Sequence, residues 1–211
     1  MSPLKNKKIL ITCGPTWVAI DEVRVLSNIS SGELGHRLAE SAIKAGAQVT
    51  LLDGQTTDVV KIKNKNLKII KFKFFNDLWR LLQKELKKDY AVVIHAAAVS
   101  DFEPEKTIKG KINSSNKLTL ALKSTFKIIN RIKKINPDIF LVGFKLEPNL
   151  TEKNVFEKSK KLFNHSHCDL VVANSTNKNT YQAFIVTSQS LIIAKVKSRQ
   201  QLVEKLLKNI P

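Results

Sequence analysis

Short apolar runs alternate with amphipathic helical segments along most of this chain, and this alternation limits the possible folds more than any other feature. Residues 8–12 and 90–95 are compact apolar runs, whereas residues 31–45 place leucine and alanine at spacings of three and four, which is one face of a helix. Strand-like and helix-like segments in alternation are typical of a parallel sheet with helices on both faces. The first constraint is therefore an α/β architecture.

The remaining segments extend the same pattern to the C-terminus. Further strands are expected at 49–52, 68–72, 118–122, 139–143 and 169–173, and further helices near 76–86, 125–136 and 151–163 and from 198 onward. Asn76 is the expected N-cap of the first of these helices. Residues 182–187 and 191–196 predict a hairpin, and the polar stretch 103–117 predicts a mobile loop. We therefore expect one domain over residues 1–211, a Rossmann-like three-layer fold with a mostly parallel sheet and a C-terminal β-hairpin extension.

Charge and cysteine content narrow the class of protein. The 211 residues carry 36 Lys and Arg against 18 Asp and Glu, a formal net charge of +18, but the basic residues are mostly lysines spread over many segments. A concentrated basic stripe is absent, so we expect no nucleic-acid partner. No apolar run is long enough to span a membrane, and the two cysteines are far apart and form no CxxC pair. A cytoplasmic enzyme with reduced thiols is the expectation.

A glycine-containing segment opens the first predicted helix. Ser30 or Ser31 can cap that helix, and Gly32 would let an anion approach the backbone N–H groups at its positive end. A phosphate site is one interpretation, and an ordinary serine-capped helix with a closely packed glycine is the other.

The turn after the first strand is not a dinucleotide-binding fingerprint. It reads Cys13-Gly14-Pro15-Thr16 and contains no GxGxxG. The candidate phosphate-binding glycine lies some fifteen residues further along. This displacement disfavours an oxidoreductase that uses NAD(P), although the predicted architecture alone would allow one.

Several motifs in a fixed order carry a resemblance to a known family. They are 11–16 (ITCGPT), 20–24 (IDEVR), 27–32 (SNISSG) with Gly35, 45–49 (AGAQV), 95–102 (HAAAVSDF), 110–112 (GKI), 118–120 (LTL), 142–144 (VGF) and 169–174 (DLVVAN). Together they resemble the phosphopantothenate-cysteine ligase family over nearly the whole chain. The resemblance implies a ligase that joins 4'-phosphopantothenate to cysteine in coenzyme A biosynthesis.

The family reaction, by this resemblance, passes through an acyl-nucleotide intermediate formed from a nucleoside triphosphate. A carboxylate that meets a triphosphate needs cations, helix-terminal N–H groups and Mg²⁺ to neutralise the developing charge. CTP, giving an acyl-cytidylate, is favoured over ATP as co-substrate. The resemblance also implies a homodimer and, since this domain stands alone here, a separate phosphopantothenoylcysteine decarboxylase.

The same resemblance assigns roles to individual residues. The catalytic candidates are Asn28, for the acyl-nucleotide, and Lys111, on a flap over the phosphates. Nucleotide-binding candidates are Ser30, Ser31, Gly32, Ala96, Ala97, Asp101, Phe144, Lys145 and Glu147. Arg24, Asn28 and Asp101 are the candidates for binding phosphopantothenate.

Several points stay open at this stage. The flap lysine could instead be Lys106, Lys109 or Lys117, because the family often continues Lys-Ile-Lys where this chain has Lys111-Ile-Asn113. Arg24 could act in its own subunit or in a partner's. The chain departs from the common family pattern at Cys13, Pro15 and residues 17–19. His165, His167 and Cys168 could be metal ligands by residue type, but too few further ligands are near, so no protein metal site is expected.

Overall fold

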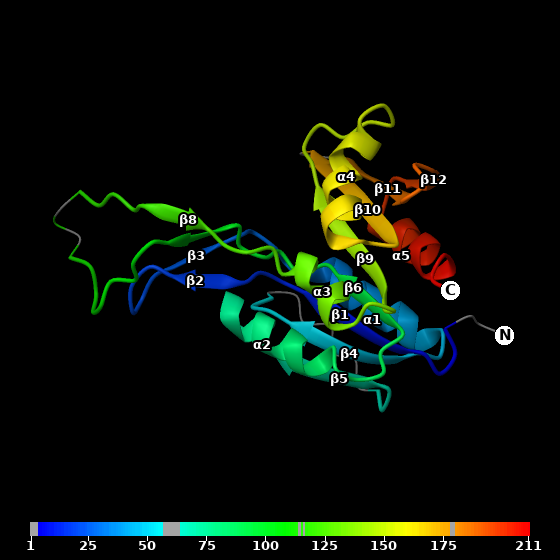
Figure 1. Ribbon diagram of the computed structural model, residues 1–211, viewed down its shortest axis with the longest axis horizontal. Coiled ribbons are helices and arrows are strands. Elements are labelled where there is room, and N and C mark those ends of the chain that lie inside the picture. Colours follow the sequence, from blue (N-terminus) through cyan, green and yellow to red (C-terminus); the bar gives the residue numbers. More distant parts are fainter. Residues whose placement is uncertain (1–3, 57–63, 114, 116, 178–179) are drawn as a thin grey trace.

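The computed structural model describes residues 4–56, 64–113, 115, 117–177 and 180–211. An eight-stranded sheet lies at its centre, with the strand order β12-β11-β10-β9-β6-β1-β4-β5 (Figure 1). The six strands from β10 to β5 are parallel, and β11 and β12 continue the sheet antiparallel at one edge. The strands are β1 (Lys8–Cys13), β4 (Gln48–Asp53), β5 (Leu67–Lys71), β6 (Val92–His95), β9 (Phe140–Leu146), β10 (Leu170–Asn177), β11 (Thr180–Thr187) and β12 (Ile192–Val196). The predicted Rossmann-like fold with a C-terminal hairpin is confirmed.

Helices cover both faces of this sheet and enclose two apolar cores. α1 (Glu33–Lys44) and α5 (Arg199–Lys208) pack on one face. α2 (Phe75–Glu85), α3 (Ile129–Ile135) and α4 (Val155–Ser166) pack on the other (Figure 1). In β1, Ile9 and Ile11 belong to the first core and Leu10 to the second, and all three are fully buried. Burial on both faces explains why the central strands are continuous apolar runs rather than alternating ones.

The ends of the helices follow from specific capping groups. Ser198 caps α5, since its Oγ accepts a hydrogen bond from the N–H of Gln201 at 3.2 Å. The predicted Asn76 cap is wrong, because α2 begins one residue earlier and the N–H of Phe74 donates to the Asp77 carboxylate at 2.9 Å. The predicted helix bounds shift by a few residues elsewhere, as expected where local propensity meets tertiary packing.

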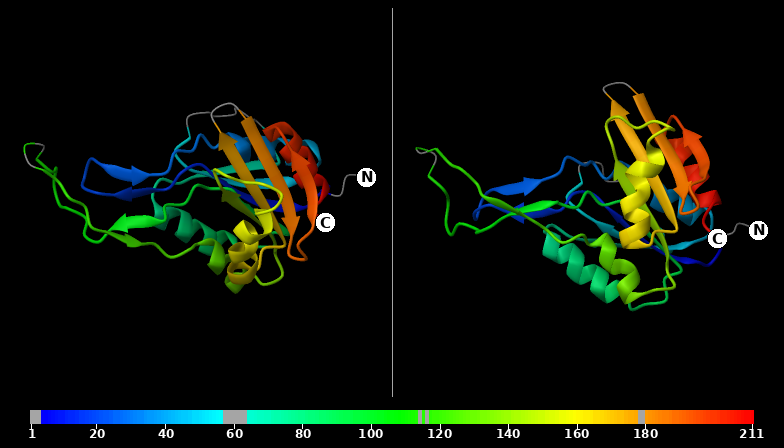
Figure 2. Two further views of the ribbon diagram at one scale, coloured as in Figure 1. Left: turned by 90° about the horizontal axis from the view of Figure 1, so that it is seen from above. Right: turned by 45° about the horizontal axis from the view of Figure 1, so that its top comes forward.

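Two antiparallel ribbons form an arm that leaves the sheet (Figures 1 and 2). One pairs β2 (Trp17–Ala19) with β3 (Val25–Ser27), and the other pairs β7 (Phe102–Pro104) with β8 (Leu122–Ser124). The predicted strand at 118–122 is wrong, because the paired segment begins at its last residue. Strands of three residues are too short to show a period of two, so the sequence did not indicate the arm.

The segment predicted as a mobile loop, 103–117, begins in β7 and makes contacts in its described part. The N–H of Ile108 donates to the carbonyl of Ile20 at 3.0 Å, and the N–H of Gly110 donates to the Glu22 carboxylate at 3.1 Å. These bonds hold the loop against the turn between β2 and β3.

Within the described ranges, no helix is both long and apolar enough to cross a membrane.

Candidate functional site

The sheet reverses its strand order beside β1, and this point locates the candidate site. The chain runs outward from β1 to β4 and β5, then returns to add β6, β9 and β10 on the other side of β1. In open α/β sheets, ligands bind beyond the carboxyl ends of the strands at such a switch point. The residues that follow β1, β4, β6 and β9 are therefore the ones to inspect.

Three glycines meet beyond the carboxyl ends of β1 and β4. A Cβ on Gly32 would lie 2.3 Å from Thr56 Cγ2, a Cβ on Gly14 would lie 2.7 Å from the same atom, and a Cβ on Gly54 would lie 2.6 Å from the carbonyl oxygen of Pro15. Gly14 and Gly32 also have positive φ angles of 78°. We call Gly14, Gly32 and Gly54 the glycine cradle. Side chains are excluded here both by space and by backbone conformation.

The cradle includes the start of α1. Gly32 is the N-cap residue of α1, and the N–H of Glu33 donates to the Ser31 Oγ at 3.3 Å. Ser31 therefore helps to cap the start of α1, whereas Ser30 forms no hydrogen bond with another residue in the described part of the chain. The remaining first-turn N–H groups have no acceptor within the helix and carry its positive dipole. A phosphate group suits this position.

The end of β6 lies beside the cradle and is held by β1. The N–H of Ala96 donates to the carbonyl of Thr12 at 3.1 Å, and the N–H of Ala97 donates to Thr12 Oγ1 at 3.2 Å. Both N–H groups are therefore used inside the protein and are not available to a ligand. Thr12 Oγ1 is also 2.9 Å from His95 Nδ1, and burial lowers the pKa of His95 to about 4.

Asn28 is brought to this same edge from a segment distant in sequence. Its Nδ2 donates to the carbonyl of Val99 at 3.0 Å, and the side chain is exposed. Thr16 and Ser100 join the two segments beneath it, because the N–H of Ser100 donates to Thr16 Oγ1 at 2.9 Å. The predicted neighbourhood of Asn28, Ala96 and Ala97 is therefore a single region of the structure.

The end of β9 contributes the third group of predicted residues. Phe144 is half-buried: its side chain packs against the α1–α5 core and also remains partly exposed. Lys145 Nζ lies 3.0 Å from the Glu147 carboxylate, and Lys158 adds a second contact at 3.7 Å. The hydrogen bond from Lys145 holds the pKa of Glu147 below its ordinary value. The Lys145 and Glu147 side chains can each exchange partners, because both remain partly exposed.

Comparison with known proteins matches this arrangement to a described family. Residues 4–210 match the family described as the DNA/pantothenate metabolism flavoprotein C-terminal domain. The chain belongs to this family. The coenzyme A biosynthesis bifunctional protein CoaBC of Thermococcus kodakarensis is 39% identical over 173 residues, which are 82% of this chain and 42% of that protein. CoaBC of Methanocaldococcus jannaschii is 32% identical over 214 residues, 97% of this chain and 51% of that protein. The chain thus spans about half the length of these relatives.

Solved structures of the family have the same fold. The DNA/pantothenate metabolism flavoprotein from Streptococcus pneumoniae superposes with a TM-score of 0.86 at 31% identity, over 97% of this chain and 98% of that one. The C-terminal domain of a CoaBC protein superposes with a TM-score of 0.78 at 26% identity, over 100% of this chain and 96% of that one. The Rossmann-like assignment therefore holds for the family as well as for this chain.

Two of the predicted family residues lie apart from the cradle, at the end of the arm. Arg24 donates to the buried Asp21 carboxylate and to the carbonyl of Ile112 at 3.2 Å, next to Lys111. The Asp21 carboxylate also accepts the N–H of Ile112 at 3.0 Å. Although burial opposes ionisation, these bonds hold the pKa of Asp21 well below its ordinary value. The arm carries this group away from the sheet (Figure 1), so Arg24 and Lys111 do not join Asn28 within this chain.

The candidate flap lysines are not distinguished by burial. Lys111 is exposed, and so are Lys106, Lys109 and Lys117. Lys109 and Lys111 both lie between residues that are hydrogen-bonded to the β2–β3 turn, since Ile108, Gly110 and Ile112 all donate to it. The backbone of each is therefore held while its side chain is exposed.

Asp101 lies between the cradle and the arm and is paired. Its exposed carboxylate forms an ion pair with Lys127, which precedes α3. The carbonyl of Asp101 accepts the N–H of Thr125 at 3.0 Å, and the carbonyl of Ser100 accepts Thr125 Oγ1 at 2.7 Å. Sequence reasoning missed Lys127 and Thr125, because only the fold brings them to Asp101.

A buried carboxylate beneath the cradle was also missed. Asp53, at the end of β4, is 1% exposed and contacts His36, Cys13, Thr56 and Lys71. In dinucleotide-binding Rossmann domains an acidic residue binds the ribose hydroxyl. Both oxygens of Asp53 already have protein partners, which argues further against NAD(P) as a ligand. Its acidic side chain after an apolar strand was the available sequence signal.

The segment with His165, His167 and Cys168 is not where potential metal ligands lie close together in the described part of the chain. In the described part of the chain, the only group of three is Cys13, His36 and Asp53, all buried. His165 and His167 are exposed, whereas Cys168 is buried near Gly143, and burial raises its pKa to about 12. The segment 165–168 therefore forms no candidate metal centre among the described residues.

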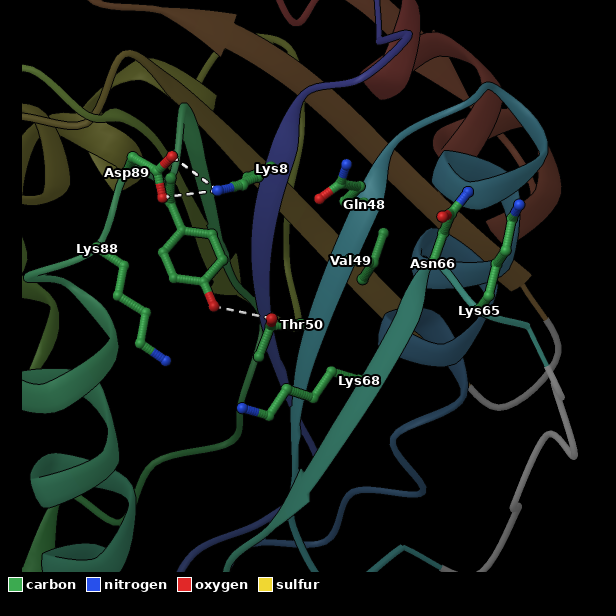
Figure 3. A pocket seen from close by; sticks show the side chains of 10 residues that line it. Lys8, Gln48, Val49, Thr50, Lys65, Asn66, Lys68, Lys88 and Asp89 are labelled. Carbon is green, nitrogen blue, oxygen red and sulfur yellow. Dashed lines mark hydrogen bonds and ion pairs between the residues drawn. The ribbon is translucent and has the colours of Figure 1, made fainter.

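A hollow lies at the opposite, amino-terminal edge of the sheet (Figure 3). It has a volume of about 460 Å³. The lysines that line it are Lys8, Lys65, Lys68 and Lys88. Lys8 is paired with Asp89 at 2.7 Å, and Lys88 with the buried Glu85 at 2.7 Å. None of the predicted site residues lines this hollow.

Proposed function

We propose that this chain is a phosphopantothenate-cysteine ligase that uses a nucleoside triphosphate. The observation that carries the proposal is the glycine cradle with Asn28 beside it at the switch point between β1 and β6. The curated relatives are named as coenzyme A biosynthesis proteins, which supports the same assignment. A dinucleotide enzyme would carry a GxGxxG fingerprint in the turn directly after β1, and this chain has Cys13-Gly14-Pro15-Thr16 there.

The proposed reaction has two balanced steps. A carboxylate oxygen of 4'-phosphopantothenate attacks the α-phosphorus of the nucleotide, and the bond to pyrophosphate breaks. The cysteine amine then attacks the acyl carbon, loses a proton, and the nucleoside monophosphate departs with its bonding electrons. The protein's task is to hold two anions together and to stabilise the charge that develops between them.

The residues of the site divide this task. The cradle and the first turn of α1 receive the phosphates, because the first N–H groups of α1 have no acceptor within the helix and carry its positive dipole. Asn28 donates through its amide to the acyl group, a role that adds no charge. Asp101 accepts hydrogen bonds from the pantothenate part. Phe144, with the backbone at Lys145 and Glu147, borders the base.

Magnesium is proposed to enter with the nucleotide. Mg²⁺ is usually held by substrate phosphates and one or two carboxylates, and it keeps several waters. Asp101 and Glu147 are two carboxylates of this edge, and both are partly exposed and paired with lysines that can release them. These groups fit an ion shared with the triphosphate, whose charge it would neutralise. No protein cage is required.

We propose a homodimer in which the arm of one chain completes the site of the other. Arg24 and Lys111 lie at the end of the arm, away from the cradle of their own chain (Figure 1). The arm also exposes apolar side chains, with Val23 62% and Phe102 51% exposed. Contact with a second copy would cover them and bring Arg24 to the phosphate of phosphopantothenate.

Turnover with defined substrates tests the reaction. Pyrophosphate release is measured with 4'-phosphopantothenate, cysteine and either CTP or ATP, and we expect faster release with CTP. Carboxylate labelled with ¹⁸O should deliver one labelled oxygen to the released nucleoside monophosphate. Absence of release with both nucleotides would exclude the ligase, and label in pyrophosphate or free phosphate would exclude the acyl-nucleotide.

Single variants test the assigned roles. Asn28→Ala and Lys111→Ala should each reduce kcat by about a hundredfold, the scale for one group that stabilises a transition state, with unchanged circular dichroism. Lys109→Ala is the matched control on the same loop and should stay within about twofold of the wild type if Lys111 is the flap lysine. Near-normal rates for both test variants would overturn the assignment.

Mixing two inactive variants tests the shared site. If Arg24 acts in the partner's site, a mixture of Arg24→Ala and Asn28→Ala chains should regain up to about a quarter of wild-type activity, because half of the dimers would contain one intact site. If Arg24 acts in its own chain, no activity returns. Sedimentation equilibrium of the same mixture measures the dimer directly.

A further inference from the structure

The buried Asp53 carboxylate is the centre of a polar cluster that the proposed reaction does not use directly. Its Oδ1 lies 3.0 Å from His36 Nε2, 3.3 Å from Cys13 Sγ and 3.3 Å from Thr56 Oγ1. Its Oδ2 forms an ion pair with Lys71. A carboxylate with this many donors is held in one orientation, and breaking the set leaves a buried charge unpaired.

The ionisation state of the cluster follows from these contacts. Burial opposes the charge, but the hydrogen bonds from His36 and Lys71 outweigh it and lower the pKa of Asp53 to about 2. An ionised carboxylate only accepts hydrogen bonds, so His36 Nε2 carries a hydrogen. Burial and the charge of Asp53 raise the pKa of Cys13, which therefore remains a neutral thiol donor.

Three of the four donors in the cluster also touch the glycine cradle or the elements that bear it. Thr56 supplies the Cγ2 atom that a Cβ at Gly14 or Gly32 would strike. Cys13 lies under α1, since a Cβ at Gly35 would lie 2.1 Å from its Cβ, and its carbonyl accepts the N–H of Gly54 at 2.9 Å. His36 belongs to the first turns of α1 and donates its own N–H to the carbonyl of Gly32 at 3.2 Å. Through these donors, Asp53 is connected to all three loops of the cradle.

We propose that Asp53 is a positioning residue, whose buried carboxylate holds Gly14, Gly32 and Gly54 in the arrangement that receives the nucleotide's phosphates. This inference rests on the proposed function and adds to it the residue that fixes the phosphate site. Asp53 does not touch the substrate. Its negative charge lies below the cradle and is balanced by Lys71, so it does not repel the incoming phosphates.

A bound metal is the competing explanation for the same cluster. The ligand atoms of Cys13, His36 and Asp53 lie within 4.8 Å of one another. The Lys71 ammonium on Asp53 Oδ2 and the hydroxyl of Thr56 on Oδ1 instead satisfy the carboxylate with donors. A dication beside that ammonium would be opposed by its charge. The contacts therefore favour a hydrogen-bonded network.

Asp53→Asn, compared with Glu85→Gln, tests the proposal. Glu85 is an equally buried carboxylate, 1% exposed, that accepts hydrogen bonds from Lys88 at 2.7 Å and Tyr90 at 2.6 Å. It belongs to the network at the opposite edge of the sheet, where the Thr50 hydroxyl lies 2.8 Å from Tyr90 Oη (Figure 3). Both substitutions remove one buried charge, so both should lower the midpoint of urea unfolding. Only Asp53→Asn should raise the KM for the nucleotide.

The expected result is a selective change in KM. Asp53→Asn should raise the KM for the nucleotide about tenfold, as expected for lost charged hydrogen bonds, and leave kcat within about twofold. The KM for cysteine should not change, and Glu85→Gln should leave all three values within about twofold. If Asp53→Asn does not fold, His36→Gln provides the same measurement with a smaller perturbation, and its nucleotide KM should rise severalfold.

Three results would overturn the proposal. They are an unchanged nucleotide KM in both Asp53→Asn and His36→Gln, an equal rise in Glu85→Gln, or one equivalent of metal in the wild type that is absent from Asp53→Asn. Calorimetric titration with CTP and with inorganic triphosphate separates this test from the ligase assay. If the wild type binds CTP but releases no pyrophosphate, the ligase proposal fails, while the ratio of the CTP affinities of the wild type and Asp53→Asn still tests the role of Asp53. If the wild type binds neither CTP nor inorganic triphosphate, the ligase proposal and the Asp53 proposal both fail.

Discussion

Replacement of Gly32 by alanine tests the central geometric claim, that the cradle has no room for side chains. Gly32 has φ 78° and ψ −3°, a left-handed conformation, and it is the N-cap residue of α1. The added Cβ would lie 2.3 Å from Thr56 Cγ2, while the next contacts, Thr56 Cβ at 3.2 Å and the Gly14 nitrogen at 3.5 Å, are tolerable. The obstruction is therefore a single methyl group.

The expected cost has two separable parts. The left-handed backbone costs an L-residue about 1–2 kcal/mol. Overpacking against Thr56 adds about 1–3 kcal/mol. Thr56→Ser removes the obstructing methyl, keeps the hydroxyl that contacts Asp53, and costs about 1 kcal/mol on its own. In the double variant the overpacking disappears and the backbone part remains.

Urea unfolding of the four proteins measures these parts. Gly32→Ala should lose about 2–5 kcal/mol in the free energy of unfolding, and Thr56→Ser in the same chain should recover about 1–2 kcal/mol of it. Gly14→Ala is the control, because its Cβ would also lie 3.1 Å from the backbone of Gly54, which Thr56→Ser leaves in place. If the costs of Gly32→Ala and Thr56→Ser add within about 0.5 kcal/mol in the double variant, the proposed contact between the Gly32 position and the Thr56 methyl is refuted.

Two further predictions concern titration and the arm. His95 has its pKa lowered to about 4 by burial, so between pH 6.5 and about 4 the unfolded chain binds a proton that the folded chain does not. The free energy of unfolding should fall across this window by roughly 3 kcal/mol, and urea titrations at pH 7 and 4 should show a smaller fall in His95→Gln; an equal fall would contradict the assignment. Asp21→Asn should release the segment 105–113 from the β2–β3 turn, because its carboxylate accepts the N–H of Ile112. Trypsin should then cleave after Lys109 and Lys111 faster than in the wild type, and unchanged cleavage by mass spectrometry would count against this role.

Local pattern predicted the elements with a strong period and failed for the shortest ones. The strand at Tyr90–His95 was found by its apolar run, although the paired strand is Val92–His95. The closing helix expected from Ser198 begins at Arg199. The three-residue strands of the arm were missed, since their pairing depends on partners up to about twenty residues away. Asn76 was chosen as a cap by residue type, but the Asp77 carboxylate satisfies the helix terminus instead.

The candidate site shows the same division. Asn28, Gly32, Ala96 and Ala97 were identified from motifs, and the fold brings them to one edge of the sheet. The arm separates Arg24 and Lys111 from that edge, which no local pattern indicated. Asp53, His36, Thr56 and Lys71 were not identified, because a network of this kind exists only after four segments have packed together.

The sequence by itself determined that this chain forms a Rossmann-like sheet with a displaced glycine loop, because apolar periodicity and glycine placement are local properties of the chain. The motifs it carries also determined the family. Only the tertiary structure decided which polar groups meet: Asp53 with its four donors beneath the cradle, and Arg24 with the flap segment at the end of the arm. Such contacts join residues that are distant in sequence, and their free energy exists only in the folded packing.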